Sequence, residues 1–95
     1  MEVHASAEDY LEAILLLQRK MGLVRSADVA RHLDVSKPSV CHAVSSLRTN
    51  GFLQMDEHHF LILTEAGRSI AEITLEKHQF FSAMLMEAGV DPKTA

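Results

Sequence analysis

The sequence is poor in the features that mark several classes of protein. It has one cysteine, Cys41, so no disulfide can form within the chain. No stretch approaches the roughly 18 to 20 uninterrupted apolar residues of a transmembrane helix, and the N-terminus lacks the basic and apolar segments of a signal peptide. We therefore predict a cytoplasmic protein with no membrane partner.

Enzyme motifs are also missing. The chain contains no nucleophile elbow, phosphate loop, Cys-x-x-Cys or His-Glu-x-x-His, so we do not expect an enzyme. It has no repeat and no linker rich in proline or glycine, and its 95 residues are enough for a single core. A hydrophobic share of 47% with 23% charged residues is typical of a globular domain.

The segment from Ser36 to Gly51 predicts a helix with two different faces. Ser36 is a good N-cap, Pro38 is tolerated in a first turn, and Gly51 suits the end. The inward stripe is Val40, Ala43, Val44 and Leu47. The other face is Pro38, Ser39, His42, Ser45, Ser46 and Thr49, flanked by Lys37 and Arg48. A face of short polar side chains lets a helix approach a DNA groove closely. The alternative is an ordinary helix whose outer face contacts only solvent.

The surrounding pattern predicts a mainly α fold with a small β-hairpin. Helices are expected at residues 7–21, capped by Ser6, and at 27–33, capped by Ser26. With the helix that follows Ser36, the second of these forms a helix-turn-helix. Strands at 52–55 and 60–63 form a hairpin, hence a wing, and Thr64 caps a long helix to about residue 88. This is a winged helix-turn-helix with a three-helix core and a two-stranded wing.

The long helix carries more apolar residues than such a body needs. Its stripe is Ile70, Ile73, Phe80, Phe81, Met84, Leu85 and Ala88. We interpret residues 80–86 as a surface for a partner or a further segment, with packing inside one chain as the alternative.

The charge distribution bears on DNA binding. The net charge is −4, which by itself disfavours nucleic acid. From residue 25 to residue 50, however, four cations oppose two acids, so this part is net positive. The pattern favours a dimer that reads a specific site over strong non-specific binding by a monomer.

Three residues form a candidate metal site. Asp9 and Glu12 are three residues apart on the first helix, on a face expected to lie opposite its main apolar side, and His78 is the candidate imidazole. Such a donor set suits Mn²⁺ or Fe²⁺ better than a metal that prefers thiolate. The alternative is that the acids only favour the helix start and that His78 is a packing residue.

Four segments in order resemble the diphtheria toxin repressor and manganese transport regulator family: AEDYLEAI, SADVARHLDVSKPSVCHAVSSLRTNGFL, LILTEAGRSIA and EKHQFFSAMLMEAGVD. The resemblance implies a homodimeric repressor, activated by Mn²⁺ or Fe²⁺, that reads a palindromic operator near metal-uptake genes. It also implies that Asp9, Glu12 and His78 are metal ligands, with Asp9 resembling the manganese-type branch. The predicted DNA contacts are Arg25, Ser36, Lys37, Pro38, Ser39, His42, Ser45 and Arg48.

Two departures from the family pattern affect this prediction. Ser82 stands where a further acidic ligand is frequent, which puts a second metal in doubt. The chain also ends before the helix that supplies the remaining ligands and most dimer contacts. We therefore expect a truncated protein, with DNA-binding domain 1–75 and the start of a metal-binding and dimerisation region at 76–95. By itself it should bind metal weakly and dimerise weakly or not at all.

Two other functions fit the same residues. One is a winged-helix regulator that does not respond to metal. The other is a winged helix used only for protein contact, for which the acidic hairpin tip and the net negative charge are the evidence.

Overall fold

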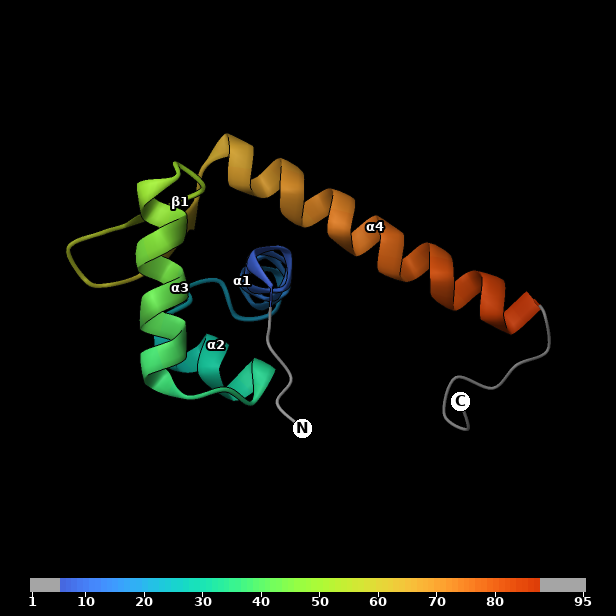
Figure 1. Cartoon of the computed structure of the whole chain (residues 1–95), viewed down its shortest axis with the longest axis horizontal. Coiled ribbons are helices and arrows are strands. Elements are labelled where there is room, and N and C mark those ends of the chain that lie inside the picture. Colours follow the sequence, from blue (N-terminus) through green and yellow to red (C-terminus); the bar gives the residue numbers. More distant parts are fainter. Residues whose placement is uncertain (1–5, 88–95) are drawn as a thin grey trace.

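Helix α1 (Ala7–Met21) lies at the centre of the fold, which the computed structural model describes for residues 6–87, with side chains for residues 6–79. The helix begins at the predicted cap Ser6, whose Oγ accepts the N–H of Asp9 at 3.2 Å, and ends at Gly22. Its buried residues are Tyr10, Leu11, Ala13, Ile14, Leu15 and Leu17. Because they cover more than one side, α1 packs against helices on several sides, and Figure 1 shows it end-on between α3 and α4.

Helices α2 (Ser26–Leu33) and α3 (Lys37–Thr49) form the predicted helix-turn-helix. Asp34 makes the turn in the left-handed conformation, with φ 56° and ψ 49°, which aspartate tolerates better than most residues. Ser36 caps α3, as predicted. The predicted cap of α2 is wrong. Ser26 is its first helical residue, because the extended residue before it, Arg25, donates its N–H to Asp28 Oδ2 at 2.9 Å.

The wing consists of strands β1 (Leu53–Met55) and β2 (Leu61–Leu63), which pair antiparallel with Leu53 opposite Leu63. Both leucines and Leu61 are buried, whereas Gln54 and Ile62 face outward, as the alternation of a strand requires. A further hydrogen bond, from Leu61 N to Val24 O at 2.7 Å, attaches the segment before α2 to the outer edge of β2.

Asp56 fixes the wing loop, since its Oδ1 accepts the N–H groups of His58 and Phe60, both at 2.9 Å. We predict that Asp56→Ala will speed amide hydrogen exchange at these two positions about fivefold, because each hydrogen bond contributes about 1 kcal/mol. The exposed neighbour Glu57 offers a matched control, and Glu57→Ala should leave both rates unchanged. Equal exchange in the two variants would show that Asp56 does not hold the loop.

Helix α4 (Glu65–Glu87) begins at the predicted cap Thr64, whose Oγ1 accepts the N–H of Gly67 at 3.1 Å. It packs on α1, and Ala71 and Thr74 are among its buried residues. In Figure 1 its later half extends past the rest of the molecule. The predicted inward position of Ile73 is wrong, since that side chain is 52% exposed. The next residue in the chain, Thr74, is buried instead. The predicted partner surface at residues 80–86 lies outside the described side chains.

The observed order of elements confirms the predicted fold class, a mainly helical winged helix-turn-helix with a two-stranded antiparallel wing and a long final helix. Within residues 6–87, no helix has the combination of length and apolar character that crossing a membrane requires.

Candidate DNA interface and metal site

The predicted DNA contacts all lie at the surface. The exposed residues are Arg25, Ser36, Lys37, Pro38, Ser39, His42, Ser45 and Arg48. All except Arg25 belong to α3 or its N-cap, and they lie on the sides of α3 that do not pack on the core. The opposite stripe is buried through Val40, Val44 and Leu47. The surface of α3 is therefore available to a partner along its whole length.

Ser36 and Ser39 are hydrogen-bonded to each other at the start of α3. Ser36 Oγ accepts the backbone N–H of Ser39 at 3.3 Å, and the two hydroxyl oxygens are 2.8 Å apart. Ser36 therefore acts as a helix cap in this structure. The first turn of a helix also carries unpaired N–H groups and partial positive charge, which attract phosphate.

Arg25 lies beside Phe60, at the loop end of the wing. Its Cζ is 4.3 Å from the centroid of the Phe60 ring, which is a cation–π contact. The side chain joins the start of α2 to the wing. The two histidines at the wing tip, His58 and His59, are exposed.

A surface hollow separates α3 from β1. It is lined by Ser45, Arg48, Thr49, Leu53, Gln54 and Met55. Ser45 and Arg48 are predicted contacts, whereas Gln54 is a polar residue that the sequence pattern did not single out. Its outward position on a short strand is the signal that could have identified it. The hollow places an arginine, hydroxyls and an amide between α3 and the wing.

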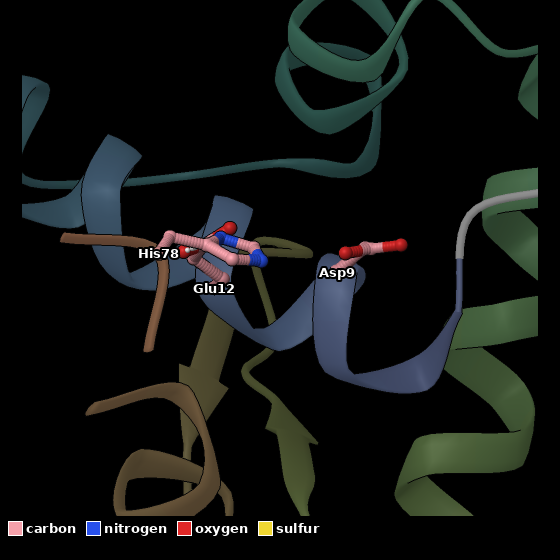
Figure 2. A group of neighbouring side chains, drawn as sticks. All are labelled: Asp9, Glu12 and His78. Atoms are coloured by element: carbon pink, nitrogen blue, oxygen red, sulfur yellow. Dashed lines mark hydrogen bonds and ion pairs between the residues drawn. The ribbon is translucent and has the colours of Figure 1, made fainter. Parts of the chain in front are cut away.

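The candidate metal ligands come together across α1 and α4. His78 Nδ1 lies 2.7 Å from Glu12 Oε2, although the residues are 66 positions apart in the chain. Candidate ligand atoms of Asp9, Glu12 and His78 all lie within 4.8 Å of one another. Figure 2 shows His78 and Glu12 beside each other, with Asp9 on the neighbouring turn of α1.

Burial distinguishes Glu12 from an ordinary surface acid. Its side chain is only 14% exposed, whereas that of His78 is 55% exposed. The expectation that this face of α1 lies opposite the packed side is therefore wrong, because α4 covers it. A largely covered carboxylate is stabilised by a partner, which His78 provides here and a cation would also provide.

The donor set fits a divalent metal. Two carboxylates and one imidazole suit Mn²⁺ or Fe²⁺. Two atoms bound to one ion at about 2.1 Å each lie at most about 4.2 Å apart, so small side-chain rotations are enough to bring these donors together. Asp9 and Glu12 also border a hollow against the turn between α2 and α3, which offers an ion a path from solvent.

Comparison with known proteins identifies the family of the chain. Residues 2–59 match the model of the iron dependent repressor, N-terminal DNA binding domain. The transcriptional regulator MntR of Escherichia coli is 35% identical over 88 residues, which cover 93% of this chain and 57% of the relative. MntR of Salmonella typhimurium is also 35% identical, with 93% and 56% covered. The chain thus spans little more than half the length of these relatives.

Solved structures show the same fold. The crystal structure of T. acidophilum IdeR matches with a TM-score of 0.87 and 27% identity, covering 96% of this chain and 43% of that one. Lactococcus lactis ZitR matches with a TM-score of 0.73 and 21% identity, covering 94% and 61% of the two chains, and this likeness concerns the fold alone.

Proposed function

The chain belongs to the iron dependent repressor family, and from this premise we propose that it is a sequence-specific DNA-binding transcriptional regulator controlled by a divalent metal. One observation carries the proposal. A cluster of two carboxylates and an imidazole joins α1 to α4 in a domain whose α3 presents a short polar face to solvent.

In this proposal α3 enters the major groove of DNA. Pro38, Ser39 and His42 at its N-terminal half face the base edges, because short side chains let a helix approach closely. Lys37 and Arg48 contact phosphates on the flanks. The hollow between α3 and β1, which is lined by Ser45, Arg48 and Gln54 among others, receives the sugar-phosphate backbone of the DNA next to that groove. Arg25 holds the wing and contributes positive charge.

Asp9, Glu12 and His78 would hold Mn²⁺ or Fe²⁺, and the bound ion would supply a cross-link between α1 and α4. The chain's own residues prepare this link, since Glu12 already contacts His78. In a homodimer that reads a palindromic operator, such a link would favour the arrangement in which two α3 helices are about 34 Å apart, one turn of DNA.

The proposal divides the chain by role. Residues 1–75 form the DNA-binding domain, and residues 76–95 begin the metal-binding and dimerisation region. His78 belongs to the second part and its partner Glu12 to the first, so a metal there would connect the two functions.

A winged helix that only contacts proteins is the second candidate, favoured by the net charge of −4. One experiment decides between the DNA-binding regulator and the protein-contact module. Duplexes that bind the chain are selected from a random DNA pool, and their binding is then measured by gel shifts at increasing salt. Binding of DNA through phosphates must weaken as salt rises. A regulator that responds to metal should also lose affinity for the selected duplex when a chelator is added, and unchanged affinity would leave a regulator that does not sense metal.

Arg48→Ala is expected to weaken binding of the selected duplex roughly tenfold and to lower the salt dependence by about one counterion per protomer. Arg19→Ala is the matched control, because Arg19 is also exposed but lies at the end of α1, 3.9 Å from Glu72. Arg19→Ala should change neither the affinity for the duplex nor its salt dependence. Equal effects of the two variants would mean that the chain attracts DNA only through its overall charge.

A further inference from the structure

Asp9 takes part in two arrangements at once. Its carboxylate belongs to the candidate metal cluster, and its Oδ2 also accepts the backbone N–H of Ser6 at 2.9 Å. In return, Asp9 donates its own N–H to Ser6 Oγ at 3.2 Å. These reciprocal bonds form a capping box at the start of α1.

We propose that Ser6 is a positioning residue of the metal site. Its backbone N–H holds Asp9 Oδ2, which leaves Oδ1 as the donor that Asp9 offers to the metal. A carboxylate can serve both partners, because it has two oxygens and both accept. The inference deepens the proposed function and rests on it.

The backbone of Ser6 is itself well placed to hold Asp9. Its carbonyl accepts the N–H of Tyr10 at 3.0 Å, the first backbone bond of α1, and the Tyr10 side chain is 6% exposed in the core. The orientation of Asp9 is thus tied through Ser6 to the packed helix. Partners that orient a metal ligand in this way commonly change metal affinity 10- to 100-fold.

Two substitutions at one position separate the hydroxyl of Ser6 from its N–H. Ser6→Ala removes the hydroxyl and keeps the N–H that holds Asp9. Ser6→Pro removes both, and the φ of −79° at this position lies within the range of proline. The difference between the two variants therefore reports the bond from the N–H to Asp9.

The test is a Mn²⁺ titration of the full chain followed by the electron paramagnetic resonance signal of the free ion. We expect Ser6→Pro to bind Mn²⁺ about tenfold more weakly than Ser6→Ala. Thr64→Ala is the control. It removes an equivalent capping hydroxyl from the start of α4, where Thr64 Oγ1 accepts the N–H of Gly67, and should leave Mn²⁺ affinity unchanged.

Circular dichroism without metal supplies a second measurement. A purely structural role would lower helix content and Mn²⁺ affinity in proportion, and that result would overturn the proposal. Equal affinities of Ser6→Pro and Ser6→Ala would overturn it too, while leaving the metal site in place. If the unsubstituted chain shows no Mn²⁺ binding that depends on Asp9, the proposed metal site fails together with the role of Ser6.

Discussion

Asp9→Asn is expected to lower the affinity of the chain for Mn²⁺ at least about 100-fold and to abolish any stimulation of operator binding by Mn²⁺. Asparagine retains an oxygen that can accept the N–H of Ser6, so the capping box at the start of α1 remains. What it loses is the anionic donor, and loss of a direct ligand should exceed the 10- to 100-fold effects typical of residues that only orient one.

Isothermal titration calorimetry with Mn²⁺ measures the change, with Glu8→Gln as the matched control. Glu8 lies in the same first turn as Asp9 and is exposed, and its carboxylate is not part of the cluster. Both variants remove one negative charge near the site, so a difference between them isolates ligation from general electrostatic attraction. Similar loss of affinity in the two variants would contradict the assignment of Asp9 as a ligand.

Gly67→Ala should destabilise the domain by about 1 to 3 kcal/mol, the usual cost of overpacking a tight contact. A Cβ at this position would lie 2.0 Å from the carbonyl oxygen of Phe52 and 3.0 Å from its carbonyl carbon. That oxygen also accepts the N–H of Thr64 at 3.2 Å, so the backbone cannot move away without losing a hydrogen bond between the wing and α4. The better helix propensity of alanine, at most about 1 kcal/mol, does not offset this.

Thermal unfolding followed by circular dichroism should show a midpoint lowered by about 10 °C, since 1 kcal/mol corresponds to roughly 4 to 8 °C in a domain of this size. Ser69→Ala, at an exposed position two residues along the same helix, should leave the midpoint nearly unchanged. If Gly67→Ala unfolds within about 2 °C of the unsubstituted chain, α4 can shift away from Phe52, and the contact is not a fixed constraint.

The ends of the helices could be read from the sequence because each depends on a few neighbouring residues. Ser6, Ser36 and Thr64 all accept the predicted backbone N–H groups. Gly22 and Gly51 adopt the positive φ angles that glycine tolerates at helix ends. The preference for a hydroxyl residue at a cap predicts Ser26, whereas the structure has Arg25 there. The carboxylate of Asp28 satisfies the N–H of Arg25 instead.

Tertiary packing decided the features that join distant segments. Periodicity shows that α4 has an apolar side but not which residues meet α1, so it predicts an inward Ile73, which is 52% exposed. The contact between Arg25 and Phe60, and the lack of room at Gly67, depend in the same way on how the wing meets α2 and α4.

The candidate metal site depends both on local sequence spacing and on tertiary packing. The sequence by itself determined that Asp9 and Glu12 share a face of α1, because residues three apart on a helix are neighbours. Only the tertiary structure decided that α4 covers this face and brings His78 to 2.7 Å from Glu12, across 66 positions of the chain. Local spacing fixes the side of a helix on which a residue lies. The packing of whole helices fixes what that side meets.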